Sequence, residues 1–132
     1  NLNKANSCTD ITGYGLLGHL LEMCIGSELS AEIYYDKIPF INSTENLAKN
    51  GIVPGGSKKN LSYVSSKVDF SNDIKEHQQL MIADAQTSGG LLISISAKNL
   101  QNLIDELKNR GCLSYNIIGA MKQKNEKRIY II

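Results

Sequence analysis

The spacing of hydrophobic residues along this chain alternates between helical and strand-like patterns. A wide apolar stripe predicts a deeply buried helix over residues 15–25. The stripe consists of Leu16, Leu17, Leu20, Leu21 and Cys24. The clearest amphipathic pattern covers residues 97–110, and Gly111 follows it as a stop signal. Runs of β-branched, aromatic and other apolar residues predict strands at 30–38, 91–95, 113–120 and 128–132.

Further elements follow from weaker signals. A short helix is expected at 43–50, capped by Ser43 or Thr44 and ended by Gly51, and another at 73–82. Residues 1–9 are mostly polar and are expected to be the tail of a preceding element, residues 51–60 a glycine-rich loop, and residues 61–72 are ambiguous.

The pattern around the predicted strands suggests how they are arranged. The run 91–95 is apolar enough to be a central strand. The charged turn 122–127 is expected to join the last two strands as a hairpin. Together these elements predict an α/β fold, a layered domain with a mixed β-sheet flanked by helices.

Composition narrows the class of protein. With 132 residues the chain suits one compact domain, residues 1–132, and its opening on Asn1 rather than methionine suggests a piece of a longer protein. The net charge of +1 gives no pull toward nucleic acid, and no apolar run is long enough for a membrane span. Three cysteines at unrelated spacings indicate neither a disulfide framework nor a zinc site, so a reducing cytoplasm is expected.

The segment Cys8-Thr9-Asp10-Ile11-Thr12-Gly13-Tyr14-Gly15 places an acid, hydroxyls and glycines directly before the first helix. Thr12 or Gly13 can cap this helix, and the free N–H groups of a helix N-terminus attract phosphates. Asp10 adds a hard oxygen ligand of the kind that magnesium takes. The segment therefore suggests a metal–phosphate site, although a local turn with a well-capped helix explains the same residues.

The same segment also imitates a dinucleotide-binding fingerprint. Gly13, Gly15 and Gly18 spell GxGxxG, and Asp36 follows at the end of the next predicted strand. A true fingerprint needs a buried apolar strand before the glycines, and residues 6–11 are too polar for one. Nicotinamide or flavin binding is therefore disfavoured. His19 lies inside the helix, where a packed histidine is commoner than a base.

Two further loops carry glycines and polar groups. Residues 51–58 nearly match a P-loop, but the order Gly56-Ser57-Lys58 is wrong for one, so a Walker-type site is rejected. The loop could hold an anion through its backbone and Lys58 or Lys59, or be an exposed turn. Residues 84–90 lead from a helix into the strand at 91–95, as functional loops often do, and are equally consistent with a simple turn.

Taken together, three separated segments resemble the selenide, water dikinase (selenophosphate synthetase) family in its C-terminal domain. They are Thr9-Asp10-Ile11-Thr12-Gly13-Tyr14-Gly15-Leu16-Leu17-Gly18-His19, Gly51-Ile52-Val53-Pro54-Gly55-Gly56 with Asn60, and Asp84-Ala85-Gln86-Thr87-Ser88-Gly89-Gly90-Leu91-Leu92. The resemblance covers essentially all of the chain. It implies the fold of the C-terminal domain of the aminoimidazole ribonucleotide synthetase superfamily.

The resemblance also implies an activity and its components. Family members, which are transferases of the kinase type, make selenophosphate, AMP and phosphate from ATP, selenide and water, with Mg²⁺. They are homodimers that hold ATP mainly in their N-terminal domains. Asp10 inherits the role of magnesium ligand. The candidates for phosphate binding or for the mouth of the site are Thr12, Gly13, Gly15, Gly55, Gly56, Thr87, Ser88, Gly89 and Gly90. The two later loops either line the mouth of the site or support the fold. The nucleophilic cysteine or selenocysteine and its lysine belong upstream, so no catalytic nucleophile is expected in this chain, which should be inactive alone.

The sequence departs from the family pattern at two positions. Tyr14 stands where the family has Phe, which changes little, and Ala85 where it has Pro, which loosens the loop. Two alternatives stay open. One is another ATP-dependent enzyme of the same superfamily, which the motif Gln86-Thr87-Ser88-Gly89-Gly90 disfavours. The other is a non-catalytic scaffold or paralogue domain.

Overall fold

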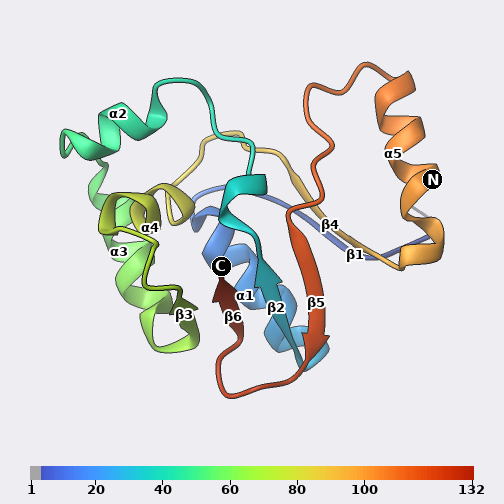
Figure 1. The fold of residues 1–132 in the computed structure, drawn as a ribbon, viewed down its shortest axis with the longest axis horizontal. Helices are drawn as coiled ribbons and strands as arrows, with labels where there is room; N and C mark the ends of the chain where they lie inside the picture. The colour runs from blue at the N-terminus through green and yellow to red at the C-terminus, as the bar shows by residue number, and fades with distance from the viewer. Residues whose placement is uncertain (1–3) are drawn as a thin grey trace.

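A computed structural model describes residues 4–132 of the chain. Its centre is a four-stranded mixed sheet in the order β3 (Val68–Phe70), β6 (Ile129–Ile131), β2 (Leu29–Ile33) and β5 (Gly119–Gln123). β6 runs parallel to both β2 and β3, whereas β5 runs antiparallel to β2. The predicted α/β fold with a mixed sheet flanked by helices is confirmed (Figure 1).

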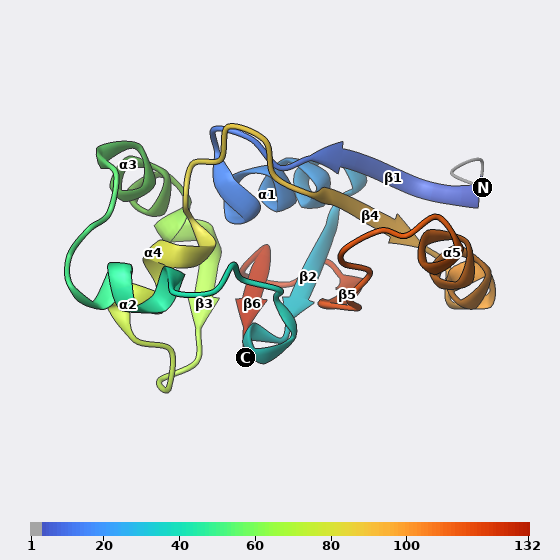
Figure 2. The same ribbon diagram turned by 90° about the horizontal axis from the view of Figure 1, so that it is seen from above.

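Helix α1 (Gly15–Ser27) covers one face of this sheet (Figure 2). The leucines of its apolar stripe, Leu17, Leu20 and Leu21, are at most 4% exposed. They join Cys24 and buried strand residues in one core. Burying such side chains stabilises a fold by about 1.5–3 kcal/mol each. The strand residues of this core are Ala31, Ile33, Val68, Ile129 and Ile131.

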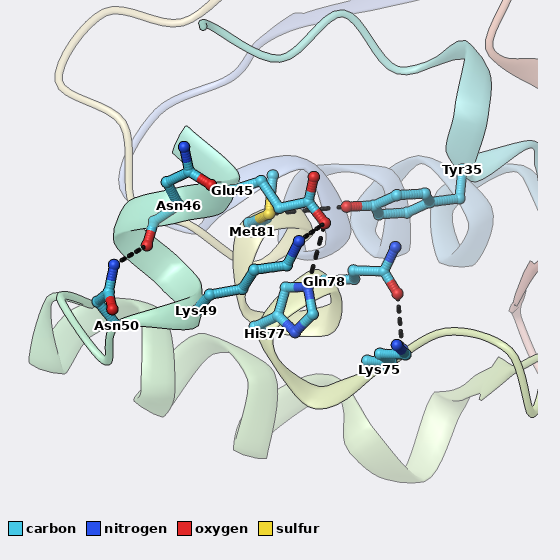
Figure 3. Close-up of polar contacts among 9 residues, drawn as sticks. All are labelled: Tyr35, Glu45, Asn46, Lys49, Asn50, Lys75, His77, Gln78 and Met81. Carbon is cyan, nitrogen blue, oxygen red and sulfur yellow. Dashed lines mark hydrogen bonds and ion pairs between the residues drawn. The ribbon is translucent and has the colours of Figure 1, made fainter. Parts of the chain in front are cut away.

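Three more helices flank this sheet on the β3 side (Figure 1). α3 (Gly55–Val64) packs against α1 and α4 (Glu76–Ile82), and α2 (Thr44–Lys49) packs against α4. Figure 3 shows the contact between α2 and α4, where Glu45 lies 3.0 Å from Lys49 and 3.3 Å from His77. Short 3₁₀ turns cover Tyr35–Lys37 and Ser65–Lys67.

A two-stranded ribbon extends from this body. β1 (Ala5–Asp10) pairs antiparallel with β4 (Leu91–Ile95), and α5 (Ala97–Asn109) lies at the far end of the ribbon (Figures 1 and 2). No helix within residues 4–132 combines the length and the apolar character needed to cross a lipid bilayer.

The ribbon overturns two predictions. Residues 5–10 form a strand rather than a polar tail. The sequence showed no strand pattern there because most of these side chains are exposed and polar. Residues 1–3 lie outside the described part of the chain. The run 91–95 is a strand but not a central one, since β1 is its partner and Leu91 is 61% exposed. An apolar run therefore did not require strands on both sides.

The C-terminal strands differ as well. The strand predicted at 113–120 begins only at Gly119, because the segment before it is irregular and Leu113 is fully exposed. β5 and β6 do not form a hairpin, since β2 lies between them. Sequence proximity favoured the hairpin, but each strand instead pairs with β2, far away in the sequence, and Ile129 and Ile131 of β6 are fully buried there.

Helix boundaries also shift. The loop predicted at 51–60 gives way to α3 from Gly55 onward, directly after Pro54. Glycine has a low helix propensity, so the two glycines at the start of α3 favoured the prediction of a loop. Helix α1 runs past Gly26 to Ser27, and Glu28 follows as the C-terminal cap in the left-handed conformation. Ser43 is the N-terminal cap position of α2, but its side chain makes no capping hydrogen bond. The strand predicted at 30–38 ends at Ile33, and the helix predicted at 73–82 begins at Glu76.

Candidate functional site

The three loops singled out from the sequence meet at the N-terminus of α1. The segment after β1 runs beside the segment before β4 and continues their ladder. The Ile11 N–H donates to the Gly90 carbonyl at 2.9 Å, and the Gly89 N–H donates to the Ile11 carbonyl at 3.0 Å. The Gln86 N–H then donates to the Thr12 carbonyl at 3.0 Å. Residues 10–13 and 86–90 are therefore positioned together by backbone bonds.

Side chains of helix α3 form hydrogen bonds with both of these segments. The buried Asn60 amide donates both to the Gly13 carbonyl, at 2.8 Å, and to the Ala83 carbonyl, at 3.0 Å. Ser57, which is fully buried, donates to Asp84 Oδ1 at 2.5 Å and accepts from the Ala85 N–H. These bonds satisfy polar groups that would be costly to bury unpaired.

Asp84 is occupied by these contacts. Its second oxygen accepts a hydrogen bond from Gln86 Nε2 at 2.7 Å. Both carboxylate oxygens therefore serve the junction of the loops, and Asp84 acts as a structural acid there. Ser57 appeared in the sequence analysis only within the rejected P-loop match, and its bond to Asp84 could not be predicted because the two residues are 27 positions apart.

Two glycines permit the close approach. Gly15 has φ +67, and a Cβ there would lie 2.7 Å from the carbonyl carbon and oxygen of Ala83. A Cβ at Gly89 would lie 2.5 Å from the Ile11 carbonyl oxygen. At Gly13, Gly55 and Gly90 an added Cβ would meet nothing within 4 Å. Gly15 and Gly89 thus serve the packing of the loops, whereas Gly13 has no such restriction.

The start of α1 differs from the prediction. Tyr14 is the N-terminal cap residue and no side chain caps the helix, so neither Thr12 nor Gly13 does so. The Thr12 carbonyl instead accepts from the Gly15 N–H, and the Thr12 hydroxyl lies 3.0 Å from His19 Nε2. The hydroxyl is therefore held by a buried histidine behind it.

Asp10 is exposed at the end of β1, opposite Leu91. Among residues 4–132, no hydrogen bond or ion pair engages its carboxylate, and no three His, Cys, Asp or Glu side chains cluster as a metal site. A free carboxylate suits magnesium, which needs further oxygen ligands that phosphates and water can supply. Asp10 therefore fits as one ligand of a shared site.

The other predicted loop residues lie at the start of α3 and in the segment that leads into β4. Gly55 and Gly56 open α3, and a Cβ at Gly56 would touch Ala85 at 3.6 Å. The exposed residues of the third loop are Thr87, Ser88, Gly89 and Gly90. Lys58 and Lys59 are exposed on α3.

The three cysteines are free thiols and lie apart from the loops' polar contacts. Cys8 and Cys112 are exposed, whereas Cys24 is buried in the core. Burial raises the pKa of the Cys24 thiol to about 11, although Arg128 opposes part of this effect. Such a thiol is a poor nucleophile at neutral pH.

The fold and the loop junction define an α/β domain in which three loops rich in glycine and polar residues meet at the start of α1. The whole chain, residues 1–132, matches the family model described as "AIR synthase related protein, C-terminal domain". The chain belongs to this family, as a C-terminal domain.

Several similar proteins carry the name selenide, water dikinase. The chain is 43% identical over 127 residues to a selenide, water dikinase of Clostridioides difficile (strain 630), covering 96% of this chain and 36% of that protein. It is 45% identical over 108 residues to the one of Myxococcus xanthus (strain DK1622), covering 82% and 31%. The resemblance inferred from the three motifs is confirmed. The chain spans about a third of the length of these relatives.

Proposed function

We propose that this chain is the C-terminal domain of a selenide, water dikinase, which forms selenophosphate, AMP and phosphate from ATP, selenide and water. One observation supports this above the others: the three motifs that resemble that family lie in one place, joined by Asn60 and by backbone hydrogen bonds around Asp10. The relatives named selenide, water dikinase support this class of enzyme, and the products of the reaction follow from the resemblance to that family.

Asp10 is proposed to hold magnesium together with ligands from outside this chain. A bound magnesium ion would neutralise charge on the ATP phosphates, as in phosphoryl transfer generally. The chain's own contribution is positional. The ladder from β1 to β4 fixes the backbone at Asp10, and Asn60 fixes Gly13 behind it. The loop residues Thr87 and Ser88 would lie at the mouth of the site.

The remaining parts of the site are proposed to lie in an N-terminal domain. The nucleophile, its lysine and most of the ATP contacts would come from there, so the 132-residue chain alone should be inactive. The parent protein is proposed to be a cytoplasmic homodimer.

The test uses the full-length parent protein with Asp10→Asn, which keeps the shape and removes the charge. We expect selenide-dependent AMP release to fall at least about a hundredfold, since a lost charged contact costs about 3 kcal/mol or more. AMP is measured with and without selenide, and folding is checked by circular dichroism.

The matched control is Asp73→Asn. Asp73 is an exposed acid in the turn between β3 and α4, and its substitution should leave turnover unchanged. Near-normal turnover of the Asp10 variant would contradict the metal role and leave this domain as structural support. Absence of selenide-dependent AMP release in the unmutated parent would contradict the proposed reaction itself.

A further inference from the structure

His19 is the one buried histidine among the described residues, and its two ring nitrogens have different surroundings. The residue is 8% exposed, with Nε2 at 3.0 Å from the Thr12 hydroxyl. Nδ1 is buried and makes no hydrogen bond, although Glu22 Oε2 lies 3.5 Å away. That separation suits electrostatic attraction but misses hydrogen-bond geometry, so a small movement of Glu22 would complete the bond.

The neighbours of the ring decide which nitrogen carries the proton. In a neutral imidazole one nitrogen donates and the other accepts. A proton on Nδ1 faces the Glu22 carboxylate, which attracts it. A bare Nδ1 would instead direct its lone pair at that carboxylate, which is unfavourable for a buried ring nitrogen even though the Glu22 side chain itself is 67% exposed. The geometry therefore favours the Nδ1–H tautomer, with Nε2 as an acceptor.

The tautomer fixes the direction of the Thr12 hydroxyl. If Nε2 accepts, the single hydroxyl proton of Thr12 points at His19, and the oxygen lone pairs remain free. No donor other than the His19 ring reaches this oxygen within residues 4–132. Such an oxygen cannot donate to a phosphate. It can accept from a water molecule bound to a cation, and Mg²⁺ typically keeps several waters.

The ring itself is held in place. The Tyr14 ring contacts it edge-on, with centroids 5.9 Å apart and an interplanar angle of 71°. Gly18 makes room for this contact, because a Cβ there would lie 2.6 Å from Tyr14 Cβ. Aromatic contacts of this geometry favour one ring orientation.

We propose that His19 is a positioning residue that accepts a hydrogen bond from the Thr12 hydroxyl. Thr12 then presents the lone pairs of its oxygen to the water shell of a divalent cation beside Asp10. This inference rests on the proposed function. It assigns Thr12 to the cation side of the site and excludes it as a phosphate donor, and it gives His19 and Glu22 a shared role through the Nδ1 proton.

The direct test is the tautomer of His19. The full-length protein is labelled with ¹⁵N-histidine and examined without metal by long-range ¹H–¹⁵N correlation, with the His19→Gln variant used to assign the signal. We expect the pattern of the Nδ1–H tautomer. The pattern of the Nε2–H tautomer, or of an imidazolium, overturns the inference, whatever the enzyme's activity.

The second test measures the Mg²⁺ concentration that gives half-maximal AMP release. Thr12→Val removes the hydroxyl at equal size and should raise this concentration about tenfold, with the KM for ATP little changed. Thr12→Ser should recover most of the loss. Thr44→Val, in α2, is the control for a threonine outside the site. An increase in the ATP KM alone would overturn the cation-side assignment.

His19 variants test whether the histidine acts through Thr12. His19→Leu removes the acceptor and should raise the Mg²⁺ requirement about as much as Thr12→Val does, whereas His19→Gln, which offers an amide oxygen, should restore it. In the Thr12→Val background, His19→Leu should add nothing. If the effects of the two substitutions on the Mg²⁺ requirement are fully additive, His19 does not act through Thr12. If His19→Leu does not fold, the Gln variant and the tautomer measurement still decide.

Discussion

At the scale of single residues, Gly15 shows how a loop junction constrains one backbone position. It has φ +67, and a Cβ would collide with the backbone of Ala83 and of Asp84. Gly13, two residues earlier, has neither restriction. The two glycines look equivalent in sequence, but only Gly15 is required for the approach of the 84–90 loop to α1.

Gly15→Ala should therefore destabilise the domain by about 2–4 kcal/mol, from the left-handed conformation and the backbone collision together. Gly13→Ala is the matched control and should cost less than about 1 kcal/mol. Urea unfolding of both variants gives the comparison. Equal midpoints for the two variants would contradict the packing described at Gly15.

At the scale of elements, Glu45 joins α2 to α4 (Figure 3). The Lys49 side chain, which donates to this carboxylate, and then His77 lower the pKa of Glu45 from its ordinary value of 4.5. A lowered pKa means that the folded state holds the charged form more strongly than the unfolded state does. The contribution is present above the ordinary pKa and is lost as the pH falls through the lowered value.

Glu45→Gln should therefore lower stability near neutral pH, and the difference from the unmutated chain should shrink as the pH falls below about 4.5. Urea midpoints measured across this range test the sign. Glu126→Gln, an exposed acid with no ion pair in the described chain, is the control and should show no such convergence. A difference that grows on acidification would contradict the pairing.

The elements also show what the sequence could predict. The periodicity of α1 and α5 was sufficient, because long amphipathic stripes leave few alternatives. β1 was missed because its exposed, polar side chains have no core-facing pattern. The glycine motifs were sufficient to single out the three loops of the candidate site. The bond between Ser57 and Asp84 and the contact between His19 and Thr12 could not be predicted, because folding alone brings these residues together.

At the scale of the whole molecule, α5 and the far end of the ribbon extend to one side of the body that contains the core, although Leu92 of β4 packs against that core (Figure 2). A two-stranded ribbon is marginally stable without further cover. β2 and β6, by contrast, lie at the centre of the larger sheet with α1 above them. The two regions should therefore open with different free energies.

Hydrogen exchange of the 132-residue chain should show this difference. Peptides from β1, β4 and α5 should exchange at least about tenfold faster than those from β2 and β6, because local opening of the ribbon exposes little of the core. Mass spectrometry resolves these segments, and α1 provides an internal reference for slow exchange. Uniform protection across the chain would contradict the division.

The position of β6 also affects how this domain is made in the cell. Ser30, at the start of the sheet, bonds to Lys127, which is 97 positions later, and β6 then inserts between β2 and β3. At about 5–20 residues per second, the ribosome needs roughly 5–20 s to bridge that interval. Until Ile131 leaves the exit tunnel, α1 lacks the part of its packing surface that β6 supplies, so the nascent chain exposes apolar side chains that chaperones can shield.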